Sequence, residues 1–341
     1  MHTTHTMHTM PITILGAGAW GTALAVSLAD RHQVLLWGRD AAAMQALRTS
    51  RRNDTYLPEI ALPSSLTIEA DFKTAIGHCA TAQSLLIVAT PVSGLRPLVQ
   101  ALAGTAIPNL VWLCKGFEEH SGLLPHQVVA EYFGAALPSG ALSGPSFALE
   151  VARGLPTALA VASHNAALRD CVVQALHGPR LRVYATSDLI GVEVGGAVKN
   201  ILAIATGLVD GLGLGMNARA ALITRGLAEI TRLGVALGGR TDTFMGLAGI
   251  GDLMLTCTGD LSRNRRVGLG LAQGKSLEVV VQELGHVAEG VRCARAVCAL
   301  AARHQVDMPI ADAVAAVLFD SANPHDVVAR LLARDPRDES I

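Results

Sequence analysis

The sequence predicts an α/β fold: an N-terminal domain with a parallel sheet covered by helices, followed by an all-helical C-terminal domain. Two observations favour this fold class. Short apolar runs alternate with Ala/Leu-rich segments of helical length in the first half of the chain. After about residue 187 only helical patterns with one apolar side recur. We expect a disordered leader over residues 1–10 and domains over residues 11–188 and 189–341.

Short apolar runs are predicted as strands of a parallel sheet, because such strands are buried on both faces. They lie at residues 12–15, 33–37, 84–89, 110–114, 157–162 and 182–185. Amphipathic segments are predicted as helices of the second domain. They lie at residues 188–212, 218–238, 276–285, 290–305 and 310–319.

The composition is that of a globular protein with a large core. Of the 341 residues 50% are apolar and 16% are charged, with a net charge of −1, so neither disorder nor a nucleic-acid partner is indicated. The six cysteines form no CxxC pair, and no histidine stands at ligand spacing beside them. We therefore expect free thiols, no metal site and a cytoplasmic protein. The leader lacks the basic and apolar regions of a secretion signal.

A glycine-rich turn follows the first predicted strand. The stretch "ILGAGAWGTALAVSLAD" places Gly16, Gly18 and Gly21 in G-x-G-x-x-G spacing, directly before a helical pattern over residues 19–30. In this context the first glycine permits a tight turn, the second lets the backbone approach a pyrophosphate, and the third lets helix and strand pack closely. The pattern predicts a Rossmann dinucleotide-binding domain.

The end of the second predicted strand bears on cofactor choice. An NAD-selective site usually has an acid about twenty residues after the turn, which binds the ribose 2′-hydroxyl. Here "WGRD" places Arg39 nearest the strand end and Asp40 next. An arginine can bind a 2′-phosphate with two hydrogen bonds, which favours NADP(H) slightly over NAD(H). The alternative is an exposed surface arginine.

Lys199 is the only charged residue between Glu193 and Asp210, in an apolar run rich in small residues. Three interpretations compete. A membrane span is disfavoured, because the run is short and contains glycines, Asn200 and the lysine itself. The lysine can extend its ammonium to water over a buried stem. Alternatively, it faces a cleft between the domains, where burial tunes its pKa for proton transfer.

A nicotinamide cofactor favours the third interpretation, because reducing a ketone by hydride requires a proton donor. Asn200 is adjacent, and "GLAGIGDLMLTCTG" supplies Asp252 and Thr256 as partners for an ammonium, although Asp252 is equally a turn or cap residue. Lys115 follows the predicted strand 110–114, at the edge of a parallel sheet where ligands bind, and "SGPSFALE" adds a turn followed by a helix start on the same edge. "LSRNRR" is a basic run, which is either a solvated face or a grip on a substrate phosphate.

These motifs together resemble bacterial NAD(P)-dependent glycerol-3-phosphate dehydrogenases. The resemblance runs in order from about residue 12 to about residue 320. It rests on "GAGAWGTALA", "CKGFE", "SGPSFA", "GVEVGGAVKNILAIATGLVDGL", "NARAALITRGLAE", "MGLAGIGDLMLTCT", "SRNRR" and "VAEGV". It implies a Rossmann domain joined to an all-α domain similar to the C-terminal domain of 6-phosphogluconate dehydrogenase, and a homodimer. The implied reaction interconverts dihydroxyacetone phosphate and sn-glycerol 3-phosphate for phospholipid synthesis.

The resemblance also implies residue roles. Lys199 matches the proton donor and acceptor. Together with Asn200 and Thr256, which their position and chemistry suggest, the expected catalytic set is Lys199, Asp252, Lys115, Asn200 and Thr256. The implied cofactor contacts are Gly16, Gly18, Ala19, Trp20, Gly21, Arg39, Lys115, Ala148, Arg263, Val287 and Glu289. The implied substrate contacts are Lys115, Gly144, Ser146, Lys199, Asp252, Ser262, Arg263 and Asn264, with Arg265 and Arg266 nearer solvent.

Two positions depart from common family choices. Ser146 stands where threonine is frequent, which keeps the hydroxyl, and Trp20 occupies a variable position. Two other functions fit parts of the sequence. One is a β-hydroxyacid or 6-phosphogluconate-type dehydrogenase, which "SRNRR" and "GIGDL" disfavour. The other is a non-catalytic dinucleotide sensor, which would not need Lys199, Asp252 and a phosphate grip together.

Overall fold

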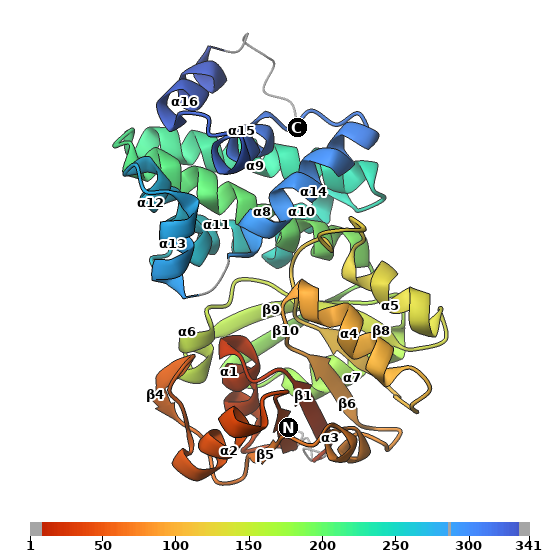
Figure 1. Cartoon of the computed structure of the whole chain (residues 1–341). Helices are drawn as coiled ribbons and strands as arrows, with labels where there is room; N and C mark the ends of the chain where they lie inside the picture. Colours follow the sequence, from red (N-terminus) through yellow and green to blue (C-terminus); the bar gives the residue numbers. More distant parts are fainter. Residues whose placement is uncertain (1–8, 286–287, 334–341) are drawn as a thin grey trace, which may run out of the picture. The chain divides into compact units, whose positions relative to one another are not determined.

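The chain divides into two compact units. The computed structural model describes residues 9–285 and 288–333, so most of the expected leader, and Val287, lie outside the described residues. Unit 1 comprises residues 1–114, 128–142 and 146–187, and unit 2 comprises residues 115–127, 143–145 and 188–341. Two short segments from the first half of the chain therefore belong to unit 2 by their contacts. The elements of both units are labelled in Figure 1.

Unit 1 contains an eight-stranded sheet. Its strands are β1 (Pro11–Leu15), β2 (Gln33–Trp37), β5 (Thr67–Glu69), β6 (Leu85–Val88), β7 (Leu110–Trp112), β8 (Ser139–Ser143), β9 (Thr157–Ala162) and β10 (Leu181–Thr186). The spatial order is β10-β9-β8-β7-β6-β1-β2-β5, and each pair in it with a defined register is parallel. A separate antiparallel pair consists of β3 (Arg52–Asn53) and β4 (Leu57–Ala61).

The six strands expected from apolar runs are confirmed, as β1, β2, β6, β7, β9 and β10. Four strands were not predicted, for local reasons. β3 and β5 have two and three residues, too few to show a period. β4 includes Pro58, and β8 has the sequence SGALS, whose small and polar residues give no apolar run.

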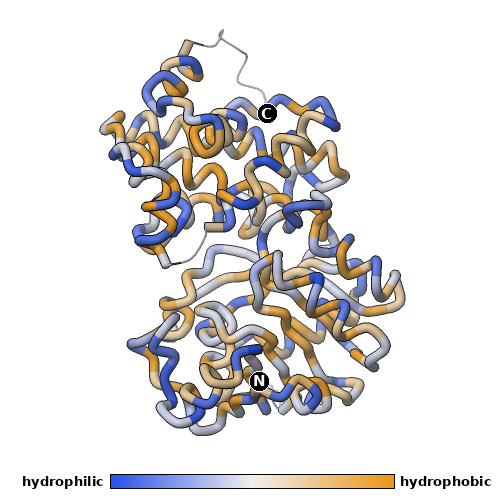
Figure 2. Tube along the Cα trace, in the orientation of Figure 1, coloured by the Kyte–Doolittle hydropathy of each residue, from blue (hydrophilic) through white to orange (hydrophobic). Residues whose placement is uncertain are grey.

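Helices cover both faces of the sheet in unit 1 (Figure 1). They are α1 (Ala19–Leu28), α2 (Ala41–Ser50), α3 (Phe72–His78), α4 (Val92–Leu102), α6 (Ala148–Ala152) and α7 (Ala166–Leu176), while α5 (Pro125–Phe133) begins within the unit 2 segment. The core consists of aliphatic residues from the strands and the facing helices, such as Ile14, Leu36, Ile87 and Val161. Apolar residues follow the strands in Figure 2, as a sheet buried on both faces requires.

The strand order contains a switch point beside β1. The chain runs outward from β1 to β2 and β5, then returns to place β6 on the other side of β1. In doubly wound folds, ligands bind at the carboxyl ends of the strands where the order reverses. The turn after β1, which carries the predicted glycine motif, lies at this point.

Unit 2 is helical, and its described residues from 188 onward contain no strand. Its elements are α8 (Leu189–Gly211), α9 (Gly215–Ala236), α10 (Thr241–Phe244), a π-type turn η1 (Leu247–Gly251), α11 (Asp252–Thr258), α12 (Arg263–Ala272), α13 (Leu277–Leu284), α14 (Glu289–Arg303), α15 (Pro309–Phe319) and α16 (Pro324–Leu332). The five helices predicted from periodicity are confirmed as α8, α9, α13, α14 and α15. The short elements between α9 and α13, and α16, were not predicted.

α8 is the central helix of unit 2. Its 23 residues are long and apolar enough to span a membrane, so the argument from a short run was wrong. However, 94% of its most apolar window is buried inside the protein, which is the environment of a core helix in a soluble protein. Asp188 caps its first turn by accepting the main-chain N–H of Gly191 at 2.9 Å.

Glycines bring α8 and α12 into main-chain contact. A Cβ at Gly207 would lie 2.0 Å from the carbonyl oxygen of Arg265, and a Cβ at Gly268 would lie 2.0 Å from that of Ile204. Only glycine fits at either position, because real Cβ atoms do not approach an oxygen so closely. This contact fixes the start of α12 relative to α8, which carries Lys199.

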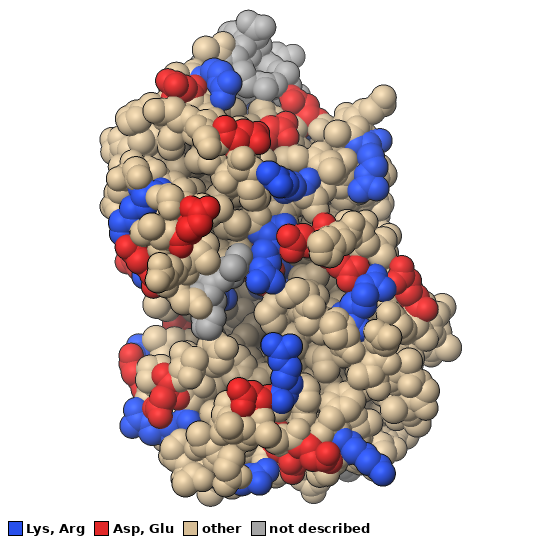
Figure 3. All heavy atoms as spheres, in the orientation of Figure 1, with Lys and Arg blue, Asp and Glu red and all other residues tan. Residues whose placement is uncertain are grey.

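Charged side chains of both signs are interspersed over the face drawn in Figure 3. No extended field of positive charge covers that face, in keeping with the net charge of −1. All six cysteines are free thiols, as expected.

Candidate active site

The glycine turn of unit 1 has the geometry of a phosphate-binding loop. Gly16 has φ +127°, and a Cβ there would lie 2.8 Å from the carbonyl oxygen of Ala89, just after β6. A Cβ at Gly21 would lie 2.0 Å from the carbonyl oxygen of Gly16. In contrast, a Cβ at Gly18 would meet nothing within 4 Å. Two glycines therefore close the turn, while the middle one leaves open space beside the backbone.

The start of α1 offers donors to that open space. Gly18 is its N-cap, and no side chain caps the helix, so the first N–H groups have no side-chain partner. Such N–H groups and the helix dipole together bind phosphate. Trp20 Nε1 is buried without a hydrogen-bond partner among the described residues. The residues present therefore fit the pyrophosphate of a dinucleotide.

Arg39 and Asp40 have different surroundings at the end of β2. Arg39 is exposed and makes no hydrogen bond or ion pair with the part of the chain that the structure describes. The Asp40 carboxylate caps α2 by accepting the N–H of Ala43 at 3.0 Å. Asp40 is thus already engaged, and Arg39 is the available side chain for a ribose substituent.

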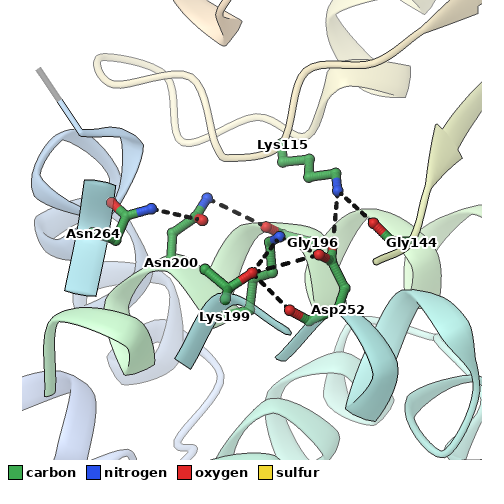
Figure 4. Close-up of polar contacts among 8 residues, drawn as sticks. Lys115, Gly144, Gly196, Lys199, Asn200, Asp252 and Asn264 are labelled. Carbon is green, nitrogen blue, oxygen red and sulfur yellow. Dashed lines mark hydrogen bonds and ion pairs between the residues drawn. The ribbon is translucent and has the colours of Figure 1, made fainter. Parts of the chain in front are cut away.

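Unit 2 brings two lysines to one buried carboxylate (Figure 4). The Lys199 ammonium donates to Asp252 Oδ1 and, at 2.9 Å, to the hydroxyl of Thr256. The Lys115 ammonium donates to the other oxygen, Asp252 Oδ2, at 2.7 Å, and to the carbonyl oxygen of Gly144 at 3.1 Å. Lys199, Asp252 and Thr256 are all buried. Lys199 is therefore buried and paired inside the protein and does not extend its ammonium to water.

These pairings shift the pKa values of both charged partners. Burial lowers the pKa of Lys199 to about 8, because Asp252, which acts against burial, is itself opposed by Lys115. Burial acts to raise the pKa of Asp252, but the two lysines, Lys115 first, outweigh it and hold that pKa below its ordinary value. A carboxylate that stays charged beside an ammonium with a pKa near neutrality is suited to reversible proton transfer.

Local backbone geometry places Asp252 against α8. It follows η1, where the chain kinks at Gly249, and a Cβ at Gly249 would lie 2.0 Å from the carbonyl oxygen of Phe244. A Cβ at Gly195 would lie 2.5 Å from the carbonyl oxygen of Ala248. Single π-type turns of this kind occur frequently at functional sites. Glycines on both elements therefore let η1 rest on α8 one helical turn before Lys199.

A second, uncharged network lies beside the lysines. Asn264 Nδ2 donates to Asn200 Oδ1 at 2.9 Å, and Asn264 Oδ1 accepts the N–H of Gly290 at 3.0 Å. Asn200 Nδ2 donates in turn to the carbonyl oxygen of Gly196 at 3.4 Å. The network joins α8, α12 and the start of α14, so it fixes how the amide of Asn200 is oriented next to Lys199.

The basic run "SRNRR" starts α12 and divides into residues with different roles. Ser262 is the N-cap and accepts the N–H of Arg265 at 3.3 Å. Arg263 is exposed and has no hydrogen-bond partner among the described residues. The expectation that Arg265 faces solvent was wrong. Its side chain is only 12% exposed and pairs with Asp210 of α8 at 2.8 Å. Arg266 is exposed, as expected.

The remaining predicted site residues are divided between the two units. In unit 1, Ala148 packs in the same small apolar cluster as Ala19 and Trp20, and Ser146 lies just before α6. In unit 2, Glu289 begins α14. Partial burial raises its pKa, against the effects of Arg292 and then Arg263.

Sequence reasoning missed the glycines that shape the site, including Gly195, Gly196 and Gly290. A Cβ at Gly290 would lie 2.5 Å from the carbonyl oxygen of Asn200. A signal was present, because α8 carries small residues at three- and four-residue spacing, which is typical of closely packed helices. No comparable sequence signal predicted the contact of His126 with Glu193 or the ion pair of Asp210 with Arg265.

The phosphate-binding turn at the switch point and the paired, buried lysine define the class: a nicotinamide-dinucleotide-dependent dehydrogenase. Two family models cover most of the chain. "NAD-dependent glycerol-3-phosphate dehydrogenase N-terminus" matches residues 11–169, and the corresponding "C-terminus" matches residues 188–329. The chain belongs to the NAD-dependent glycerol-3-phosphate dehydrogenase family.

Individual relatives agree with this assignment. The chain is 70% identical over 330 residues to a "Glycerol-3-phosphate dehydrogenase [NAD(P)+]" of Herminiimonas arsenicoxydans, covering 97% of this chain and 99% of that protein. The same values hold for a protein of that name from Janthinobacterium sp. (strain Marseille). The crystal structure of glycerol-3-phosphate dehydrogenase from Coxiella burnetii superposes with a TM-score of 0.90 at 41% identity, covering 96% of this chain and 99% of that one.

Proposed function

We propose that the protein reversibly reduces dihydroxyacetone phosphate to sn-glycerol 3-phosphate with NAD(P)H. The observation that supports this most is the buried Lys199–Asp252 pair, whose lysine has a pKa of about 8, in a chain of this family. The relatives' name gives the substrate and allows either cofactor. A ketone reduction needs a donor of this kind near neutral pH.

The roles of unit 1 in this proposal concern the cofactor. When bound, the reduced nicotinamide supplies a hydride to the carbonyl carbon. The turn of Gly16, Gly18 and Gly21 holds the pyrophosphate, with Ala19, Trp20 and Ala148 beside it. Arg39 binds the adenosine ribose, with a preference for the 2′-phosphate of NADP(H).

The roles of unit 2 concern the proton and the substrate. Lys199 donates a proton to the substrate oxygen during reduction and takes it back during oxidation. Asp252 and Thr256 hold the ammonium in place, and Asn200 orients the substrate. Lys115 contacts both substrate and cofactor, and Gly144 is a substrate contact. Ser146, a residue of unit 1, is a further substrate contact. Arg263 and Asn264 bind the phosphate, Ser262 orders the start of α12, and Glu289 lies near the cofactor.

We also propose a division of labour and a setting. Residues 11–188 form the cofactor-binding domain, which also contributes Lys115, Gly144 and Ser146 to the substrate. Residues 189–341 form the catalytic and substrate-binding domain, which also places Glu289 near the cofactor. The protein acts in the cytoplasm as a homodimer and supplies glycerol 3-phosphate for phospholipid synthesis. The direct test is reduction of dihydroxyacetone phosphate with NADPH and NADH side by side. Turnover of 6-phosphogluconate or a β-hydroxyacid in place of this substrate would reject the proposal.

Cofactor choice gives a prediction for Arg39. Arg39→Ala should weaken NADPH binding about 10- to 150-fold more than NADH binding, because a charge-assisted contact contributes about 1.5 to 3 kcal/mol. The dissociation constants of both cofactors measure this in the mutant and the wild type. Equal losses for the two cofactors would show that Arg39 only packs beside the adenosine.

The pKa of Lys199 gives a prediction about pH. Reduction needs the ammonium form, so kcat for reduction should be full well below pH 8 and fall as pH rises through about 8. Oxidation of glycerol 3-phosphate needs the neutral amine and should fall as pH drops through the same region. Profiles of both directions with saturating cofactor test this. Parallel profiles for the two directions would reject Lys199 as the shared group.

A further inference from the structure

A buried carboxylate on α8 has no role in the reaction as proposed so far. Glu193 lies six residues before Lys199, about 9 Å along the helix axis, and only 2% of its side chain is exposed. Its Oε1 accepts the main-chain N–H of His126 at 2.9 Å, and its Oε2 pairs with His126 Nδ1. Burying a carboxylate is costly unless it is paired and hydrogen-bonded in this way.

The partner of Glu193 belongs to the segment that carries Lys115. Residues Lys115–Gln127 pack with unit 2, and Phe117 and Leu124 lie in its core. At one end of the segment the Lys115 stem lies over Gly196, where a Cβ would be 3.3 Å from Lys115 Cγ. At the other end His126 meets Glu193. Glu193 and Gly196 are three residues apart, so both ends rest on one face of α8.

We propose that Glu193 is a positioning residue, which holds the segment Lys115–Gln127 on α8 through His126 and so keeps the Lys115 ammonium beside Asp252. The reaction in which Lys115 takes part rests on the function proposed above. Because Gly196 has no side chain, the Lys115 stem can lie close to α8. Glu193 fixes the other end of the segment at His126. Without Glu193, the segment loses its polar anchor at the His126 end, while Phe117, Leu124 and the Lys115–Asp252 ion pair remain.

The position of Lys115 matters for Lys199, because the two ammonium groups share one carboxylate. The charged groups acting on Lys199 are Asp252 from α11 and Lys115. The thiol of Cys257 in α11 stays neutral, since burial raises its pKa to about 12. Lys115 lowers the pKa of Lys199. If Lys115 moves away, Asp252 serves Lys199 alone and the pKa of Lys199 rises.

The positioning role predicts that Glu193→Ala changes the pKa of Lys199 in the opposite direction to the simple loss of a nearby negative charge. Deleting a carboxylate near an ammonium removes attraction and lowers the pKa of that ammonium. Glu193→Ala should instead raise the pKa of Lys199, because the indirect loss of Lys115 dominates. The same rise should follow Lys115→Met. In the Lys115→Met background, Glu193→Ala should cause no further shift, because the two changes act through one contact.

The chain offers a direct readout, since it contains only four lysines: Lys73, Lys115, Lys199 and Lys275. Lysine labelled with ¹³C at Cε gives few NMR signals, assigned by single Lys→Met variants. Titration of the full-length protein without substrate then follows Lys199 directly. We expect the Lys199 midpoint at about 8 in the wild type and at higher pH in Glu193→Ala and Lys115→Met.

Matched variants separate positioning from stability. Glu229 is another buried carboxylate of unit 2, which accepts the N–H groups of Ile310 and Ala311. Glu229→Ala should lower Tm but leave the Lys199 midpoint unchanged. His126→Ala keeps the main-chain donor and should shift the midpoint less than Glu193→Ala. Glu193→Gln keeps one acceptor oxygen and should recover most of the wild-type behaviour, which also provides a folded variant if Glu193→Ala does not fold.

Kinetics complete the test. Glu193→Ala should raise the KM for dihydroxyacetone phosphate about 10-fold, the scale of one charge-assisted contact, while Glu229→Ala should not. An unchanged or lowered Lys199 midpoint in Glu193→Ala would overturn the positioning role, as would a further rise in the Lys115→Met background. If the wild type does not reduce dihydroxyacetone phosphate, the proposed function fails, and the NMR titration still decides the role of Glu193.

Discussion

Lys199→Met is expected to lower kcat for the reduction of dihydroxyacetone phosphate by about 100-fold or more, the contribution of a positioned general acid. Methionine keeps roughly the volume of the lysine stem but removes the proton. The substitution should leave the fold intact, because Asp252 remains paired with Lys115 at 2.7 Å. No buried charge is then left without a partner. An unpaired buried charge is the usual reason why removing one member of a buried ion pair destabilises a protein.

The measurement must separate chemistry from binding. Cofactor affinity should change little in Lys199→Met, since the cofactor residues proposed in unit 1 are untouched. Lys275→Met provides the matched control, because Lys275 pairs with Glu283 and is partly exposed. It should have wild-type kcat. A Lys199→Met enzyme that turns over at nearly the wild-type rate would remove Lys199 from the mechanism.

Arg263→Ala is expected to lower kcat/KM for dihydroxyacetone phosphate by at least about 100-fold, using a few kcal/mol for a lost contact to a charged group. The substrate has a reacting carbonyl at one end and a phosphate at the other. Binding energy from the phosphate can position the carbonyl. Arg263 is exposed and has no hydrogen-bond partner among the described residues, whereas Arg265 is already paired with Asp210.

The substrate without its phosphate provides the internal comparison. Arg263→Ala should affect dihydroxyacetone far less, and Arg263→Lys should recover only part of the loss, because lysine lacks the planar fork of arginine. Arg266→Ala is the exposed neighbouring control and should be nearly silent. NADPH affinity must be measured in the same variants. Equal losses for both substrates, or a loss of NADPH binding alone, would assign Arg263 to the cofactor.

Patterns in the sequence predicted those parts of the fold that depend on local regularity. The glycine turn with its flanking strand and helix was predictable because each glycine answers a separate steric need. β8 and η1 were not, because their positions are decided by neighbours far away in the sequence. α8 shows the limit most clearly, since its length and composition fit a membrane span, whereas the structure buries 94% of its most apolar window.

The candidate site divides in the same way. That Lys199 needs a partner was predictable from the cost of burying an ammonium, and the structure supplies Asp252 and Thr256. That one carboxylate serves both Lys199 and Lys115 was not, because it depends on where the segment Lys115–Gln127 packs. Arg265 was misassigned because charge alone cannot tell a surface arginine from one paired with a buried carboxylate. Val287 lies outside the described residues, so its role stays a prediction.

The glycine contact between α8 and α12 fixes the distance between the two helices where they cross. Main chain meets main chain at Gly207 and Gly268, so no rearrangement of side chains can bring the helices closer, and one added methyl group would force them apart. Lys199 lies in α8, and Arg263 is the first residue of α12. Adapting the protein to a ligand one carbon longer therefore requires changes to the residues at the start of α12, because the contact between the two helices cannot adjust.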